Sequence, residues 1–268
     1  MDQERAPLPP PPSLRPRGVG ELLTAAFQLY RRHWATFLRL VAIVVVPLTL
    51  LQYALADLAA GGLRVRGQEV EVTAAGGRAI AASAIVGIFS LLITQLLIGA
   101  LVWAVVVAVV GREPSVEESY RFGLARVWSI LWIGLLVALA TFAGLLLFIV
   151  PGIIVLVRLS MAVPALVVER RRGGEALSRS WSLVRGHGWH VFGTFIVALL
   201  LVSLVSNLFT ALAAGSGWVV QALLGAVAQV ITTPFTAIVT ALLYLDLRAR
   251  AEGLDLETLA RELDAARP

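Results

Sequence analysis

Six apolar runs occupy most of this chain, and each is about as long as the hydrocarbon core of a bilayer is thick, or longer. The runs cover roughly residues 36–58, 80–110, 127–149, 152–168, 190–213 and 217–246. A helix needs about 20 predominantly apolar residues to cross a bilayer, and a soluble fold has no use for so much contiguous apolar sequence. We therefore expect an all-α polytopic membrane protein with six transmembrane helices.

The same runs limit the chemistry that the chain can perform. They use up nearly all of the 268 residues and leave no room for a separate globular catalytic domain. The chain has no cysteine, which excludes thiolate nucleophiles and thiolate metal sites. The three histidines, His33, His187 and His190, are not spaced with a carboxylate as metal ligands are. We expect a protein that is not an enzyme and that uses no metal and no cofactor.

Arginine supplies all of the positive charge, since the chain contains no lysine and carries a net charge of +5. In a soluble protein this excess would suggest nucleic acid, but beside membrane spans arginines set orientation and contact anionic head groups. We therefore expect membrane lipids, and other membrane proteins, as partners rather than nucleic acid. Arginines flank the runs on one side of the membrane, and on the other side only the first loop carries them, as Arg64, Arg66 and Arg78. Both termini are therefore predicted to be cytoplasmic, in a multi-pass plasma-membrane protein.

The chain divides into three parts. Residues 1–16 include the proline run Pro9–Pro12 and lack the apolar centre of a signal peptide, which predicts a disordered, solvated tail. Residues 17–250 are predicted to form the six-helix membrane domain. Residues 251–268 are predicted to form a cytoplasmic amphipathic helix, because Leu256, Leu259 and Leu263 share one side of it.

An internal repeat organises the membrane domain. Three segments begin near a glutamate, at Glu21, Glu117 and Glu175, and each leads to a tryptophan, Trp34, Trp128 or Trp189, and then to an apolar run. Apolar residues in these segments recur at helical spacing. We therefore expect three transmembrane hairpins, each preceded by an amphipathic helix on the cytoplasmic interface, with the second hairpin turning at Pro151-Gly152.

One arginine lies inside a predicted span. An ionisable side chain at the bilayer centre costs about 2.5–3.5 kcal/mol on insertion scales. Arg158 lies about seven residues beyond the turn at Pro151-Gly152, so it is expected roughly 10 Å below the outer surface. It has two interpretations: a structural partner of backbone carbonyls or amide side chains, or a contact for an anion or a lipid phosphate.

Uncharged amides in the outer half of the spans would then surround Arg158. They are Gln52, Gln95, Asn207, Gln221 and Gln229. Together with Arg158 they would line a polar pocket that opens outward. The alternative is that each amide makes an interhelical hydrogen bond. Prolines at Pro47, Pro164 and Pro234 predict kinks in three spans, as in transporters and in many packed membrane helices.

Two stretches carry a family resemblance. The first runs from Pro151-Gly152 through Arg158 and Glu169 to Ser180-Trp181, and the second is residues 244–256, which contain Asp246. They resemble the membrane domain family named after glycerophosphoryl diester phosphodiesterases. The resemblance implies a multi-helix protein of the bacterial plasma membrane that works beside lipid or envelope metabolism.

The resemblance implies no catalytic role for its motif positions. These positions are Pro151, Gly152, Glu169, Ser180, Trp181 and Asp246. The soluble phosphodiesterase domain with its metal-binding acids and histidines, which some members of the family carry, is missing here. The first hypothesis is therefore a non-enzymatic scaffold or accessory factor in lipid or envelope processes. The second is a transporter or a lipid-binding permeation protein that uses the pocket around Arg158, and a third is an intramembrane phosphodiesterase.

Overall fold

The structure is a computed structural model that describes residues 16–66, 69–171 and 173–266. Its elements are, in chain order, α1 Val19–Arg32, α2 Trp34–Gly61, β1 Leu63–Arg66, β2 Glu69–Val72, α3 Ala74–Val109, α4 Val116–Ala125, α5 Val127–Leu147, α6 Ile149–Leu159, α7 Ala162–Glu169, α8 Gly174–Val184, α9 Gly188–Ala213, α10 Trp218–Glu252 and α11 Leu256–Ala266. Six helical segments are long and apolar enough to cross a membrane, with α6 and α7 together forming one of them. The predicted fold class is confirmed. The predicted tail, residues 1–16, lies outside the described residues except for Pro16.

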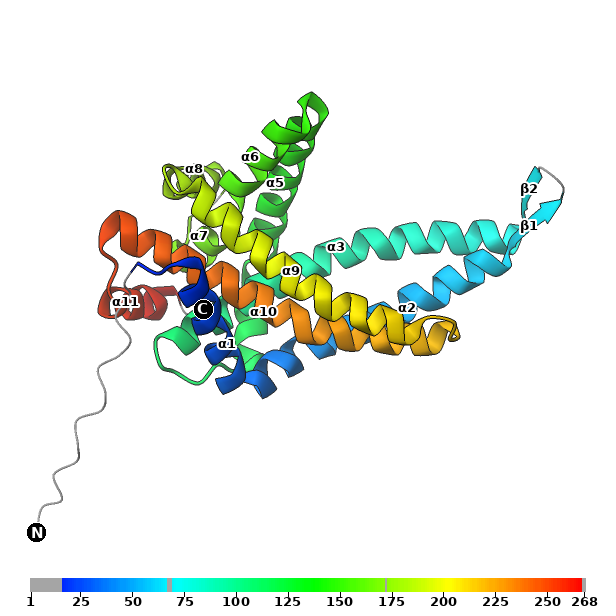
Figure 1. Cartoon of the computed structure of the whole chain (residues 1–268), viewed down its shortest axis with the longest axis horizontal. Coiled ribbons are helices and arrows are strands. Elements are labelled where there is room, and N and C mark those ends of the chain that lie inside the picture. The colour runs from blue at the N-terminus through cyan, green and yellow to red at the C-terminus, as the bar shows by residue number, and fades with distance from the viewer. Residues whose placement is uncertain (1–15, 67–68, 172, 267–268) are drawn as a thin grey trace, which may run out of the picture.

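The threefold repeat is present in the order of the helices. The short helices α1, α4 and α8 precede the hairpins α2–α3, α5–α6 and α9–α10. The first and third hairpins pack side by side along α2 and α10, and both point in the same direction (Figure 1). The hairpin α5–α6 contacts them only near its base and then diverges (Figure 1). The repeat therefore describes the chain order, whereas the packing of the three hairpins is unequal.

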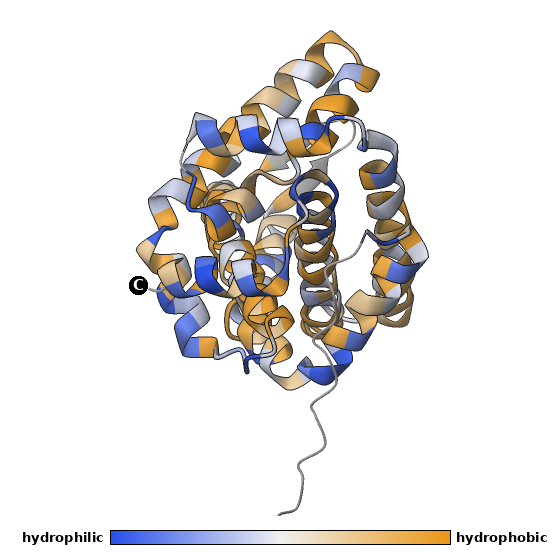
Figure 2. Cartoon of the chain, turned by 90° about the vertical axis from the view of Figure 1, so that its left-hand side faces the viewer, coloured by the Kyte–Doolittle hydropathy of each residue, from blue (hydrophilic) through white to orange (hydrophobic). Residues whose placement is uncertain are grey.

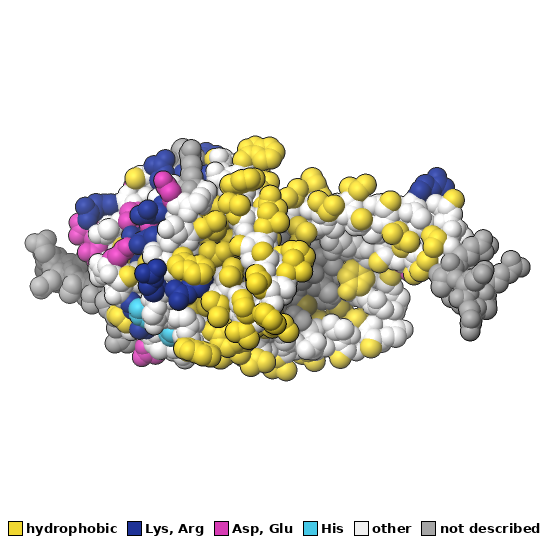
Figure 3. Space-filling view, turned by 90° about the horizontal axis from the view of Figure 1, so that it is seen from above, with side chains coloured by type: hydrophobic (Ala, Val, Ile, Leu, Met, Phe, Trp, Pro, Cys, Tyr) yellow, Lys and Arg dark blue, Asp and Glu magenta, His cyan; other side chains and the backbone are white. Residues whose placement is uncertain are grey.

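Charge and apolar surface lie at different ends of the molecule. Charged side chains gather around α1, α4, α8, α11 and the end of α10, which we call the charged end (Figure 3), and the ribbon at this end is rich in hydrophilic residues (Figure 2). Away from this end the helices expose large apolar side chains, among them Ile85, Phe89 and Leu204. A helix that is apolar on all sides is stable only in a protein core or in lipid. Trp128 and Trp189 lie where the charged end meets this apolar zone, and their exposed fractions are 81% and 86%.

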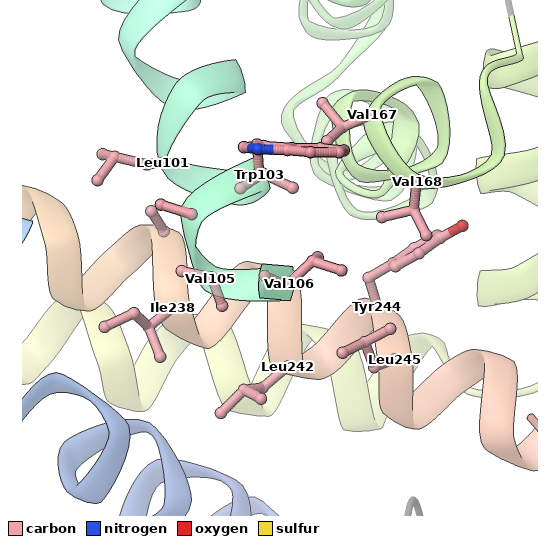
Figure 4. Close-up of a cluster of buried hydrophobic side chains, with 14 of the residues drawn as sticks. Leu101, Trp103, Val105, Val106, Val167, Val168, Ile238, Leu242, Tyr244 and Leu245 are labelled. Atoms are coloured by element: carbon pink, nitrogen blue, oxygen red, sulfur yellow. The ribbon is translucent and has the colours of Figure 1, made fainter. Parts of the chain in front are cut away.

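The core is densest next to the charged end, where α3, α7 and α10 meet. From Gly99 to Ala108 every residue of α3 is buried. Trp103 of this stretch stacks on Phe122 of α4, with the ring centroids 4.0 Å apart. The side chains of α3, Val167 and Val168 of α7, and those of α10 interdigitate in this region (Figure 4). This packing fixes the ends of the helices that carry the ionisable groups.

The second hairpin differs from its prediction in two places. Its turn is at Phe148, between α5 and α6, and Pro151-Gly152 lies in the first turn of α6. Proline suits the first turn of a helix because the N–H that it lacks would have no partner there. The predicted fourth span is broken at Ser160-Met161, so α6 and α7 are separate helices. Pro164, in the first turn of α7, lacks the N–H that would bond back across this break.

The other two prolines leave their helices unbroken. Both α2 and α10 run continuously through Pro47 and Pro234. A proline frees one backbone carbonyl and bends a helix, but it ends the helix only where the packing gives the chain another course. Of the three prolines, all of them in the described residues, Pro164 alone lies beside an interruption of its span.

A short ribbon of two strands was not predicted. β1 and β2 pair antiparallel, from Leu63 opposite Val72 to Arg66 opposite Glu69. The sequence alternates apolar and charged residues in both strands, as a strand with two unlike faces requires. The ribbon lies at the far end of the first hairpin from the charged end (Figure 1).

Candidate functional site

Ionisable side chains from four helices meet at the charged end around Glu169, the last residue of α7. We call this group the Glu169 cluster; it consists of Glu169, Arg171, Arg179, Tyr244, Arg248, Glu252 and Glu262. It connects α7, α8, α10 and α11. The exposed fraction of the Glu169 side chain is 8%, so the contacts of this carboxylate are almost entirely with protein.

Glu169 accepts hydrogen bonds from three directions. The Nε of Arg179 lies 2.8 Å from both carboxylate oxygens, and the Nε of Arg171 lies 2.8 Å from Oε2. The hydroxyl of Tyr244 donates to Oε1, and the Nε of Arg248 lies 3.4 Å from the same oxygen. A buried carboxylate is tolerated only when it is paired and hydrogen-bonded in this manner.

The arginines of the cluster also reach the other two glutamates. Arg248 binds Glu262 of α11 in bidentate fashion, at 2.7 and 3.0 Å, and its Nε lies 3.2 Å from Glu252. Arg179 donates to Glu252 as well. Burial acts to lower the pKa of Arg179, but its hydrogen bonds to Glu169 and Glu252 outweigh that effect and raise the pKa. Three arginines face three glutamates, so the cluster is electrically balanced.

The C-terminal helix is held against the charged end by further contacts. Arg112 binds Asp264 at 2.6 and 2.9 Å. Arg126 and Arg170 donate to the carbonyl oxygens of the last two residues of α11, which have no partner within the helix. Leu259 and Leu263 of α11 are buried on the side of the helix that faces the protein. An amphipathic helix is present at Leu256–Ala266, shorter than the predicted residues 251–268 because residues 251 and 252 belong to α10, and its apolar face packs against the protein.

Asp246 ties the beginning of the chain to the end of α10. Its Oδ1 accepts from the backbone N–H of Arg17 at 2.6 Å, and its Oδ2 accepts from the Nε of Arg250 at 2.7 Å. Arg250 in turn donates to the carbonyl oxygen of Arg17 at 2.6 Å. The Nε2 of His190 lies 3.3 Å from Oδ2. Asp246 therefore joins the start of α1, the start of α9 and α10.

Ser180 and Trp181 of α8 contact the residues on either side of the break between α6 and α7. The Ser180 hydroxyl donates to the carbonyl oxygen of Arg158 at 2.7 Å and accepts from the backbone N–H of Met161 at 3.0 Å. The ring of Trp181 lies 5.2 Å from the guanidinium carbon of Arg158. Backbone groups that the broken helix leaves free are thus satisfied by α8, which stabilises the break.

Arg158 is not where the sequence placed it. It lies against α8 at the charged end, and not in the half of the spans that is far from that end. Counting from Pro151-Gly152 began three residues beyond the turn, which is at Phe148, and it assumed that the second hairpin runs parallel to the other two, from which it diverges (Figure 1). The chain then leaves α6 at Leu159 to meet α8.

Gly152 meets Gly144 across the hairpin, where a Cβ on Gly144 would lie 2.9 Å from the Gly152 Cα.

The structure does not bring the predicted amides together with Arg158. Gln52 donates to the hydroxyl of Ser90 on α3 at 2.7 Å, and Gln95 packs beside Gly134 of α5. Gln221 donates to the carbonyl oxygen of Ser216 in the turn before α10. The last two amides, Asn207 and Gln229, are exposed on α9 and α10. Of the five amides, all of which the structure describes, Gln52 alone makes the interhelical hydrogen bond that the alternative interpretation expected.

A groove with a volume of about 500 Å³ does lie beside Arg158. Its lining residues are Val150, Ile153, Ile154, Val157 and Arg158 of α6, and Gly186, Gly188, Trp189 and Phe192 of the segment that starts α9. None of the predicted amides lines it. The groove is apolar except at the end where Arg158 lies.

Sequence reasoning missed most of the Glu169 cluster. Arg179, Tyr244 and Arg248 were not predicted as site residues. The spacing of polar residues in α10 does indicate that Tyr244 and Arg248 share one face. Tyr244 and Arg248 lie four residues apart on one face, and Asp246 and Arg250 lie four residues apart on nearly the opposite face. Each face therefore presents a separate polar pair to a different set of neighbouring helices.

The fold and these contacts define a polytopic helical membrane protein whose charged end is held together by ion pairs. Comparison of the chain with protein-family models, with curated proteins and with solved structures finds no match.

Proposed function

We propose that this protein is a non-enzymatic scaffold or accessory factor in lipid or envelope processes of a bacterial plasma membrane, with the charged end and both termini in the cytoplasm. The Glu169 cluster carries the proposal. Its acids and bases bind one another across α7, α8, α10 and α11, and this arrangement suits a rigid surface outside the bilayer more than a reaction centre. The distribution of arginines around the spans supports the orientation.

The motif positions support the same role. Glu169, Ser180 and Asp246 each join elements that are distant in sequence, and Gly152 allows the close approach of α5 and α6. Structural duties of this kind explain the motif without catalysis. They also agree with the proposed kinship to the membrane domain family named after glycerophosphoryl diester phosphodiesterases.

Reconstituted vesicles test the proposal against its two competitors. A scaffold hydrolyses no glycerophosphodiester above the rate of empty vesicles, with or without divalent metal ions, and it passes no solute or labelled lipid across the bilayer. A photo-cross-linking residue at Arg121, exposed on α4, should give a discrete adduct with a membrane or cytoplasmic neighbour in the native cells. Metal-dependent turnover would establish an enzyme instead, and protein-dependent flux would establish a transporter.

A further inference from the structure

The groove beside Arg158 combines an apolar wall with a cation at one end. We propose that it binds one phospholipid with an anionic head group, taken from the leaflet at the charged end, with the phosphate at Arg158 and an acyl chain along α6. The inference rests on the membrane placement of the proposed function and specifies the lipid and its site.

Arg158 is available to an anion. Its guanidinium lies 3.5 Å from the carbonyl oxygen of Trp181, a long contact, and over the ring of that residue. Within the part of the chain that the structure describes, no carboxylate forms an ion pair with it, whereas every arginine of the Glu169 cluster has one. A guanidinium presents paired N–H donors that match the oxygens of a phosphate.

The groove is long enough to hold most of an acyl chain. From Arg158 to Val150 the helix α6 advances eight residues, or roughly 12 Å at 1.5 Å per residue. One leaflet contributes about 15 Å to a hydrocarbon core that is about 30 Å thick. A chain whose phosphate lies at Arg158 would therefore contact Val157, Ile154, Ile153 and Val150 over most of its length.

Aromatic rings mark the level of the head group. Trp189, 86% exposed, lines the groove at the start of α9, and Trp181 lies beside Arg158. Tryptophan prefers the boundary between head groups and hydrocarbon. Trp181 and the guanidinium thus lie together where α6 contacts α8, and Trp189 lines the same groove from the start of α9.

Two glycines keep the groove open. Gly186 and Gly188 form part of its wall, and a Cβ on either would meet no atom within 4 Å. Gly186 has φ +83°, so a substitution there would strain the backbone, but Gly188 does not have a positive φ. A large side chain at Gly188 would therefore meet no clash at its Cβ and would take up part of the groove that Gly188 lines. Gly193, five residues along the same helix, also meets nothing within 4 Å and does not line the groove.

Native mass spectrometry of the purified full chain tests the proposal, with phosphatidylglycerol and phosphatidylcholine of identical chains as the probes. The wild type should retain one phosphatidylglycerol and prefer it over phosphatidylcholine by about fivefold, the effect of one arginine near an anionic surface. Arg158→Gln should reduce this preference to parity, while Arg32→Gln, an exposed arginine of α1, should leave it unchanged. Gly188→Phe should lose the retained lipid, and Gly193→Phe should keep it.

Three results would overturn the proposal: equal retention of the two lipids by the wild type, an unchanged preference in Arg158→Gln, or equal retention by the two glycine variants. If Arg158→Gln does not fold, the salt dependence of the wild-type preference replaces it, and a preference that high salt does not weaken counts against an ionic contact. If the lipid-binding proposal fails, the expected hydrolysis, flux and cross-linking results do not change, so these experiments judge the scaffold proposal separately.

Discussion

Removing the charge of Glu169 tests the Glu169 cluster most sharply. Glu169→Gln keeps the shape of the side chain but leaves Arg171, Arg179 and Arg248 facing a neutral amide. Breaking a buried ion pair by removing one partner costs about 3–5 kcal/mol. The lower end applies here, because Arg179 retains Glu252 and Arg248 retains Glu262. We therefore expect the free energy of unfolding to fall by about 3 kcal/mol.

Equilibrium unfolding in mixed micelles, followed by tryptophan fluorescence, measures this change. Glu117→Gln is the matched control, because Glu117 is exposed on α4, and a surface substitution changes the free energy of unfolding by about 0.5 kcal/mol or less. A double-mutant cycle with Arg248→Met then separates coupling from the effect of each side chain. The two substitutions should interact by about 0.5–3 kcal/mol. Equal stability of Glu169→Gln and Glu117→Gln, or strict additivity in the cycle, would refute the reasoning.

Three further predictions follow from single contacts. A Cβ on Gly152 would lie 2.8 Å from a backbone nitrogen across the hairpin, so Gly152→Ala should cost about 1–3 kcal/mol in thermal unfolding, whereas Gly193→Ala should cost much less. Ser180→Ala leaves a buried backbone N–H without its acceptor and should cost about 1–3 kcal/mol; an unchanged melting temperature would show that α8 does not support the break. A hydrogen bond from a backbone N–H at the start of α11 lowers the pKa of Asp255, so its stabilising effect is complete above the unfolded value of about 3.9 and is lost as pH falls through the lower folded pKa. The protection factors of the α11 amides, that is, exchange rates corrected for the intrinsic pH dependence, should therefore be steady from pH 7 to about 5 and fall below about 4, and a fall already at neutral pH would contradict this assignment.

The architecture was predictable because its signals are local. Bilayer thickness fixes the length of an apolar run, and helical spacing marks α1, α4 and α8, so six spans and three amphipathic helices follow from the sequence. The strand ribbon also had a local signal, the alternation of apolar and charged residues in 63–66 and 69–72. This pattern covers only four residues in each strand and lies between two much longer apolar runs.

The candidate site was less predictable because its contacts are distant in sequence. Glu169 and Tyr244 lie 75 residues apart, and Arg17 and Asp246 lie 229 residues apart. No periodicity encodes which carboxylate meets which arginine, because many pairings satisfy the same charges. Arg158 was recognised as exceptional, but its surroundings depended on a turn at Phe148 that no glycine or proline marks.

The divergence of α5–α6 had no signal in the sequence either. The three hairpins look alike as apolar runs, and their directions depend on contacts made at their bases. Gln95 beside Gly134 and Ile130 beside Gly99 fix where α5 leaves α3. Such contacts depend on shape, which composition and periodicity do not carry.

Site-directed labelling of single cysteines tests the central claim, because the chain has no cysteine of its own. Ala214→Cys lies in the turn between α9 and α10, and Glu117→Cys and Glu175→Cys lie at the starts of α4 and α8. A membrane-impermeant maleimide should label Ala214→Cys in intact cells and the other two variants only after the membrane is permeabilised. Labelling of Glu175→Cys in intact cells, or labelling of all three from the same side, would contradict a protein whose apolar helices cross the membrane with the charged end inside.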